Sequence, residues 1–445
     1  MSADSSGIDG RGLRLGPIWL MPGVSYTNVG ALLVISFITI AMLTMVGHSN
    51  AYILNEHLAV PPSEHGGVVG RMTFYSEIVI LLLVGPLGAL SDRIGRRSIF
   101  ALGFVFLAVG YTVYPTATSV EQLTVYRLIF AVGAACIAAM LATVLSDYPQ
   151  EPSRGKLVAS SFFLNGLGMV VMVGLFGSLL GWFKGSGAGP IEAGQYAMWS
   201  VAGLCVFAAV VAAKGLQPST VELEKKEPFV ATMVGGIKQA RNPRLALAYA
   251  AGMVSRGDMS VISTFFTLWL TQVGRSRGMD TADALKLGIT FFIVLQTSAL
   301  LWPPVVSFMI DRIDRAHALA LAMCLAAAGY LTVGFIADPL GPAMYGAAVL
   351  MGIGEMSGVL TAQSLVGQEA PAKTRGTVIG AFSFFGALGI LTTVLIGGYL
   401  FDNWRPSAPF IYMGFVNCVL IVVAAATYLM APRGPQVVVS GPEVA

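Results

Sequence analysis

The feature that most constrains this chain is a series of long apolar runs separated by short polar segments. A helix that crosses the hydrocarbon core of a bilayer needs about 20 mostly apolar residues. Charged residues make up only 11% of the chain, whereas soluble domains typically carry about 25%. The sequence therefore predicts an all-α integral membrane protein. Twelve stretches qualify as transmembrane helices: 29–55, 67–90, 98–117, 121–146, 157–182, 195–215, 245–272, 286–310, 317–337, 341–366, 376–401 and 407–430.

The lysines and arginines indicate how these helices are oriented. With the N-terminus in the cytoplasm, 18 of the 26 basic residues fall in cytoplasmic segments, six fall outside and two lie within spans. Because basic residues concentrate on the cytoplasmic side, we expect a multi-pass protein of the cytoplasmic (plasma) membrane with both termini in the cytoplasm. We expect the opening stretch RLGPIWLMPG to lie along the membrane surface. The predicted regions are a cytoplasmic N-terminal segment (1–28), an N-terminal bundle (29–215), a cytoplasmic linker (216–244), a C-terminal bundle (245–430) and a cytoplasmic tail (431–445).

The two halves of the chain repeat each other in their charged loops. Arg154-Gly155 matches Arg375-Gly376 at an offset of 221 residues, within a longer similarity between 146–168 and 367–389. The stretch SDRIGRR at 91–97 is echoed by IDRIDR at 310–315. Chance similarity between hydrophobic helices would not keep charged loops in register. We therefore expect two pseudo-symmetric six-helix bundles, the plan of transporters that bind a solute between two rocking halves.

The stretch GALSDRIGRR at 88–97 resembles the signature loop between helices 2 and 3 of the major facilitator superfamily, and the twelve duplicated spans extend the resemblance over almost the whole chain. The resemblance implies the major facilitator fold. It also implies a latch that holds the cytoplasmic side shut in the outward-facing state, with Asp92 stabilised by the helix N-terminus near Arg375. A simpler interpretation, a topology signal made of positive charge, stays open. The predicted gate residues are Gly88, Asp92, Arg93, Gly95, Arg96, Arg97, Arg154, Asp311, Arg312 and Arg375.

Six ionisable residues fall inside the predicted spans, where a charge is expensive and therefore functional by default. They are His48, Glu77, Arg127, Arg256, Asp258 and Glu355. The resemblance implies that helices 1, 4, 7 and 10 surround a central cavity, which would bring all of them except Glu77 close to it.

Helix 7 carries Arg256 and Asp258 two residues apart, so on a regular helix the two side chains point about 200° away from each other. We predict that Asp258 or Glu355, rather than Glu77, neutralises Arg256 in one state. That acid takes a proton when the pair separates, because a carboxylate without its cation in an apolar environment binds a proton more readily. A permanent structural ion pair is the alternative.

Each of the other intramembrane residues, Arg127, His48 and Glu77, has two possible roles or partners. Arg127 either couples protons or forms a structural salt bridge near the outer surface, to Glu56 or Glu121. His48 is either a packing residue or, if Gly47 corresponds to Gly257 of the second half, a cavity residue opposite Asp258. Glu77 would pair with His48 or Arg127.

The sequence therefore predicts a secondary transporter that moves a small organic solute by alternating access, coupled to protons. Proton-driven multidrug efflux remains an alternative, although the Gly-Pro signature of antiporters is not evident in helix 5. A non-transporting receptor or scaffold with the same fold is a further alternative. The expected partners are the solute, protons and the lipid bilayer, and the protein is expected to work as a monomer.

Other function classes find little support. No phosphate-binding GxxxxGK[ST] motif occurs, and no nucleophile–base set indicates an enzyme. The net charge of +3 does not indicate a nucleic-acid partner. We expect no cofactor or metal, because the four cysteines lie inside apolar runs without metal-ligand spacing: Cys136, Cys205, Cys324 and Cys418. Five aromatic residues could line an amphipathic pocket: Phe265, Phe266, Trp269, Phe291 and Phe292.

Overall fold

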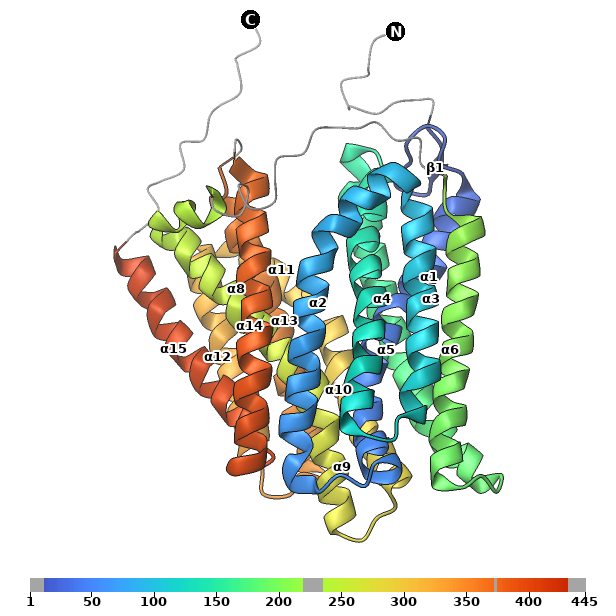
Figure 1. The fold of residues 1–445 in the computed structure, drawn as a ribbon. Helices are drawn as coiled ribbons and strands as arrows, with labels where there is room; N and C mark the ends of the chain where they lie inside the picture. The colour runs from blue at the N-terminus through green and yellow to red at the C-terminus, as the bar shows by residue number, and fades with distance from the viewer. Residues whose placement is uncertain (1–11, 219–234, 372–373, 431–445) are drawn as a thin grey trace, which may run out of the picture.

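The computed structural model describes residues 12–218, 235–371 and 374–430. Its N-terminal half consists of six long helices (Figure 1). Most of these helices extend beyond the apolar runs from which they were predicted. They are α1 (Tyr26–Tyr52), α2 (His65–Ile94), α3 (Arg96–Val113), α4 (Val120–Asp147), α5 (Arg154–Gly185) and α6 (Pro190–Gly215). A π-helical turn, Ile53–His57, continues α1.

The C-terminal half repeats this plan with two interruptions. The seventh span is one helical run in which a π-helical turn, Ile262–Phe266, joins α8 (Pro243–Val261) to α9 (Thr267–Ser276). The eighth, predicted as one helix over 286–310, breaks at Trp302, because Pro303 and Pro304 cannot donate backbone hydrogen bonds. The remaining elements are α10 (Thr281–Leu301), α11 (Pro303–Arg312), α12 (Arg315–Gly334), α13 (Ala343–Glu369), α14 (Arg375–Asn403) and α15 (Ala408–Met430).

Eleven helical segments of the described residues are long and apolar enough to cross a membrane. The run α8–α9 occupies the remaining predicted position and carries Arg256 and Asp258 in its middle. The predicted all-α membrane fold is confirmed, with one small addition. The opening stretch forms an antiparallel hairpin of β1 (Arg14–Leu15) and β2 (Ile18–Trp19), where the Trp19 N–H donates to Ser153 Oγ at 2.9 Å. The predicted tail 431–445, most of the linker and residues 1–11 lie outside the described residues.

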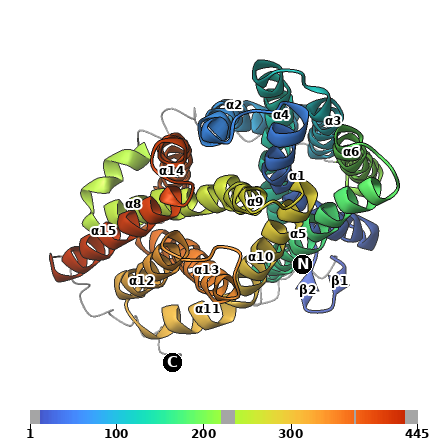
Figure 2. The same cartoon turned by 90° about the horizontal axis from the view of Figure 1, so that it is seen from below.

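The helices form two groups, α1–α6 on one side and α8 with α12–α15 on the other (Figure 2). We call the end of the bundle that contains the α2–α3 turn, the end of α6 and the start of α8 the linker end (Figure 1). The far end contains the turns at 58–64, 114–119, 186–189, 277–280, 335–342 and 404–407. The sequence predicts that the linker end faces the cytoplasm.

The turn between α2 and α3 depends on Gly95. This residue has φ +90°, a backbone conformation that side-chain-bearing residues rarely adopt. One glycine therefore ends α2 and starts α3, which explains its place in the signature stretch. The second copy replaces it with Asp314, whose side chain accepts from the Ala316 N–H and caps α12. The two loops achieve the same reversal with different residue types.

Glycines allow the two halves to touch at the far end. A Cβ atom at Gly70 of α2 would lie 2.5 Å from the carbonyl oxygen of Val394 on α14, and one at Gly398 would lie 2.5 Å from that of Gly66. Small residues permit such close approach of membrane helices. The other long contact runs between α5 and α10, where a Cβ at Gly177 would lie 3.0 Å from Ile289.

Candidate functional site: the path between the two halves

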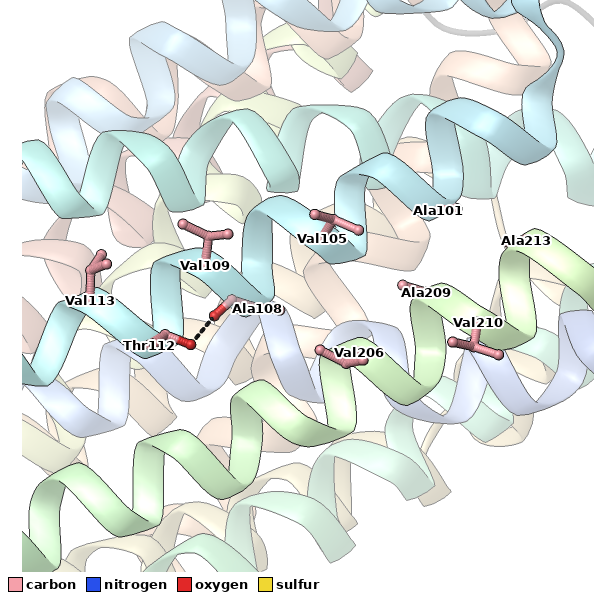
Figure 3. Close-up of a pocket in the computed structure, with 10 residues that line it drawn as sticks. All are labelled: Ala101, Val105, Ala108, Val109, Thr112, Val113, Val206, Ala209, Val210 and Ala213. Atoms are coloured by element: carbon pink, nitrogen blue, oxygen red, sulfur yellow. Dashed lines mark hydrogen bonds between the residues drawn. The ribbon is translucent and has the colours of Figure 1, made fainter.

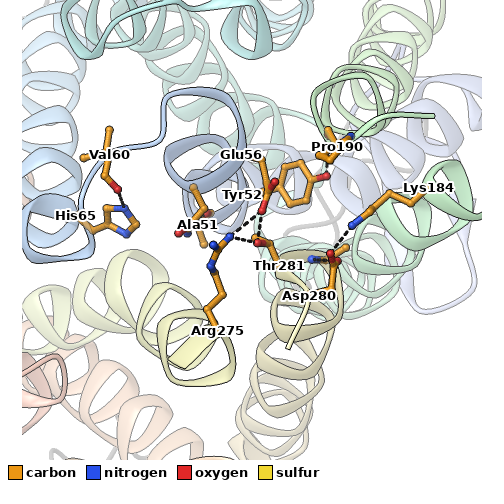
Figure 4. Close-up of polar contacts among 12 residues, drawn as sticks. Ala51, Tyr52, Glu56, Val60, His65, Lys184, Pro190, Arg275, Asp280 and Thr281 are labelled. Atoms are coloured by element: carbon orange, nitrogen blue, oxygen red, sulfur yellow. Dashed lines mark hydrogen bonds and ion pairs between the residues drawn. The ribbon is translucent and has the colours of Figure 1, made fainter. Parts of the chain in front are cut away.

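Polar contacts cross between the halves at the far end (Figure 4). Arg275, at the end of α9, donates to Glu56 of the first half at 2.8 Å, and the Thr281 hydroxyl also donates to Glu56. Nearby, Lys184 Nζ lies 2.5 Å from Asp280 Oδ2. Partial burial opposes ionisation of Asp280, but the hydrogen bond and charge of Lys184 hold the pKa of Asp280 below its usual value. These pairs fasten the far ends of α1 and α5 to α9 and α10.

Asp402, in the last turn of α14, caps a helix of the other half. The N–H groups of Gly66 and Gly67 donate to its two carboxylate oxygens at 2.8 and 2.6 Å. These N–H groups belong to the first turn of α2, where a helix has unsatisfied donors and a partial positive charge. A negatively charged cap supplied from the other half therefore stabilises the closed far end.

His48 and Gln272 make further contacts between the two halves, and those of His48 lie nearer the middle of the protein. His48 is fully buried; its Nδ1 lies 2.8 Å from Thr267 Oγ1 on α9, and its ring packs edge-on against Phe292. The Gln272 amide donates to the carbonyl of Pro62 at 2.9 Å. The structure does not bring His48 to Asp258, the alternative that the Gly47–Gly257 correspondence raised.

The linker end is different, because its described ion pairs lie within one half. Arg96 contacts Asp147 and lies 4.0 Å from Asp92, while Arg154 pairs with Glu151 at 2.7 Å. A Cβ atom at Gly88 would meet nothing within 4 Å. Helices α2 and α14 touch near Gly70 and their ribbons diverge toward the linker end (Figure 1), so between these two helices the contact is closed at the far end and open at the linker end.

The remaining predicted gate residues fit this open arrangement. Arg375 donates to the carbonyl of Gly367 within its own half, at 3.3 Å, and Arg312 lies over the Phe308 ring. Asp311 and Arg93 are exposed, and Arg97 is half-buried. A latch that closes in the outward-facing state would be released here, and its role stays a prediction.

A cavity of about 370 Å³ lies in the C-terminal half, between α8, α13 and α14. Arg256 lines it and is exposed, although it lies near the middle of a membrane-spanning run. The described residues give its guanidinium no ion pair within 4.0 Å. Glu77 of α2, in the other half, is half-buried and lies close enough to Arg256 to interact with it electrostatically. The described hydrogen bonds and ion pairs do not join Glu77 to His48 or Arg127, the two partners that the sequence predicted.

Asp258 points away from this cavity, as the two-residue spacing predicted. It is 1% exposed, and the Asn417 amide donates to its two oxygens at 3.0 and 3.1 Å. Glu355 is also buried, and the described residues offer its Oε2 no hydrogen-bond donor. Tyr330 lies close enough to interact electrostatically with both acids, and its hydroxyl also has no described partner. Neither acid pairs with Arg256 in this conformation.

Arg127 is buried in the N-terminal half without a described acid. Its guanidinium lies 5.1 Å from the centre of the Phe130 ring, close to Tyr111 and Tyr114. The predicted partners lie elsewhere: Glu56 pairs with Arg275 and Glu121 is exposed.

A second hollow is not part of this path. It is a groove of about 540 Å³ between α3 and α6, lined by alanines, valines and Thr112 (Figure 3). The Thr112 hydroxyl is already bonded to the Ala108 carbonyl. Such a surface suits lipid tails but offers a polar solute nothing to bind. The five aromatic residues considered for a pocket are instead buried among other rings, for example Phe266 and Trp269 against Phe410.

Sequence reasoning missed several residues that the structure joins. Asp402, Lys184 and Asp280 lie at predicted helix ends, where a charged residue is ordinary and gives no signal. Asn417 is a lone amide in an apolar run, a pattern that indicates a buried polar partner. Glu56 and Arg275 are 219 residues apart, close to the 221-residue offset of the repeat, but this offset alone does not indicate that the two side chains meet.

Comparison with known proteins agrees with this architecture. The family model described as Major Facilitator Superfamily matches residues 32–391 and 287–444. The magnetosome protein MamH of Paramagnetospirillum magneticum is 28% identical over 90% of this chain and 92% of its own length. MamZ of the same organism is 26% identical over 85% of this chain, which spans 59% of MamZ. A crystal structure of a point mutant of the nucleoside transporter NupG superposes with a TM-score of 0.74 at 12% identity, covering 90% of this chain and 99% of that one.

Proposed function

Because this chain belongs to the major facilitator superfamily, we propose that it moves a small organic solute across the membrane by alternating access and couples this movement to protons. The observation that carries the proposal is the asymmetry of the path between the halves. Cross-half contacts at Glu56, Asp280 and Asp402 close the far end, whereas α2 and α14 diverge toward the linker end. With the linker end in the cytoplasm, this arrangement corresponds to an inward-facing state.

The proton-coupling part of the proposal rests on Asp258 and Glu355. Both carboxyl groups are buried in the C-terminal bundle and interact electrostatically, and neither has an ion pair among the described residues. Two unpaired negative charges inside a membrane protein are costly. We infer that this pair holds at least one proton in the inward-facing state and exchanges it when the halves rock. Arg256 is then not needed to neutralise these acids and can bind a solute in the cavity.

The test is flux in proteoliposomes that contain the purified protein under an imposed pH gradient, screened with metabolites and drugs. Asp258→Asn or Glu355→Gln should abolish pH-driven accumulation and retain solute exchange at equal pH. Asp283→Asn, which changes an exposed acid at the far end of α10, is the matched control and should behave like the unmodified protein.

The other outcomes separate the alternatives. Full pH-driven accumulation by both variants would show that neither acid carries the proton. Protection against many unrelated drugs would favour multidrug efflux, and saturable binding without flux would favour a receptor. Failure of both variants to fold would favour a structural role for the buried acids.

A further inference from the structure

We propose that the solute is a small anion and that Arg256 binds it in the cavity between α8, α13 and α14. This inference rests on the proposed transport function and names the substrate class for the same path. The described lining of the cavity runs from Arg375, at the linker end of α14, to Arg256 and Gly386 further inside, and its volume of about 370 Å³ suits a small molecule.

The charge of the cavity supports an anion. Two arginines, Arg256 from α8 and Arg375 from the first turn of α14, line it, and no acid is among the described lining residues. The other polar groups are neutral: Ser255, Gln363 and Ser383. An anion would compensate this positive charge from within the cavity, which a neutral or cationic solute would not do.

The state of Arg256 supports the same conclusion. Its guanidinium has no ion pair within 4.0 Å among the described residues, and its exposed side chain lies against Gly386, where a Cβ atom would be 2.9 Å from Arg256 Cγ. The absence of a side chain at Gly386 therefore leaves room for the arginine. A planar guanidinium with free N–H groups matches the geometry of a carboxylate or phosphate.

Ser255 supplies a second, independent observation. The residue lines the same cavity and is only 3% exposed, and the described part of the chain gives its buried hydroxyl oxygen no hydrogen-bond partner. A buried hydroxyl without a partner costs free energy unless a ligand or water satisfies it. An anion held by Arg256 would accept a hydrogen bond from this neighbouring hydroxyl.

Glu77 has a defined part in this arrangement. It is the acid of the N-terminal half that interacts with Arg256, so without solute it partly compensates the arginine across the path. A bound anion takes over that compensation from within the cavity. Solute binding thus replaces the attraction between Glu77 and Arg256, which joins the two halves, with an attraction between the anion and Arg256 inside the C-terminal half.

The experiment measures the thermal stabilisation of the purified full-length protein by matched pairs of probes that differ in charge: glucose 6-phosphate and glucose, uridine monophosphate and uridine, lactate and lactamide. At least one anion should stabilise the protein while its neutral counterpart does not. Arg256→Gln should weaken that binding about 10- to 100-fold, since it removes charge-assisted hydrogen bonds. Arg256→Lys should fall between, because it keeps the charge without the planar fork.

Controls keep this test decisive. Lys286→Gln removes an exposed basic side chain from α10, far from the cavity lining, and should leave binding unchanged. If Arg256→Gln does not fold, Ser255→Ala and Arg375→Gln should each weaken anion binding several-fold. Equal binding of neutral and anionic probes, binding of no anion, or unchanged anion affinity in Arg256→Gln would overturn the inference.

Flux measurements separate this inference from the transport proposal. Anions that bind through Arg256 but never cross the membrane would refute transport and leave the anion site standing. Transport of a neutral solute that is insensitive to Arg256→Gln would refute the anion site and leave alternating access standing.

Discussion

Removal of the Asp402 carboxylate should open the far end of the protein. In the closed state this carboxylate accepts two N–H groups from the first turn of α2, at 2.8 and 2.6 Å, across the boundary between the halves. In Asp402→Ala these donors would lose their partner in the closed state but would meet water in the open state. The substitution therefore acts on the equilibrium between the two states.

The magnitude follows from the number and type of bonds. A hydrogen bond to a charged group contributes about 1.5–3 kcal/mol when it is well buried, and the half-buried position of Asp402 lowers this to about 1 kcal/mol for each bond. Asp402→Ala should then shift the equilibrium by about 2 kcal/mol, a factor of roughly 30. Asp402→Asn keeps an acceptor oxygen and loses the charge, so about 1 kcal/mol and a factor of roughly 5 are expected.

The assay is a distance measurement between nitroxide labels at Thr118→Cys and Ala337→Cys, two exposed far-end positions in different halves. Cys324, which is exposed, is first replaced by serine. The longer-distance population should grow in the order wild type, Asp402→Asn, Asp402→Ala. Asp338→Asn is the matched control, because Asp338 pairs with Arg277 at 2.7 Å within one half. Unchanged distances in Asp402→Ala, or an equal shift in Asp338→Asn, would refute the reasoning.

Three further predictions concern other contacts of the path. Asp92→Asn should impair transport with little loss of expression, as measured by proteoliposome flux, because it removes a charge from the predicted latch rather than a core contact; unchanged flux would leave only the topology signal. The pair of Asp280 with Lys184 is present above the lowered pKa of Asp280 and is lost as the pH falls through that value, so acid should lengthen the far-end label distance. That response should disappear in Lys184→Gln. Gly70→Val should prevent far-end closure, because even a Cβ atom would lie 2.5 Å from the Val394 carbonyl; an unchanged closed population in the same distance assay would contradict this.

The fold was predictable from the sequence because membrane helices must satisfy their backbone groups internally and carry long apolar runs. The same rule left the break at Trp302 unpredicted, since a Pro-Pro pair lowers the mean hydropathy of a long apolar run too little to end it. The opposite directions of Arg256 and Asp258 followed from helix geometry. Their partners did not, because Asn417 and Glu77 come from helices far away in sequence, and pairing between spans leaves no periodic signal.

The far-end pairs show the same limit. Glu56 and Arg275 are ordinary charged residues at predicted helix ends, and only the packing of α1 against α9 makes them partners. Their contact also depends on the conformation. In an outward-facing state the same residues would be separated, so a single sequence pattern cannot specify one set of partners.

The two π-helical turns, Ile53–His57 and Ile262–Phe266, lie in the first helix of each half. A π turn places its hydrogen bonds one residue further along the chain than an α turn. Each far-end tip is therefore rotated, by about 100° per extra residue, relative to the tip of a regular helix of the same sequence. Glu56 lies within the first turn and Arg275 follows the second, so both reach their partners through this rotated register. Conversion of either turn to α geometry would swing one charge out of the pair while its helix stays folded, and the two tips could unlock by twisting about their own axes.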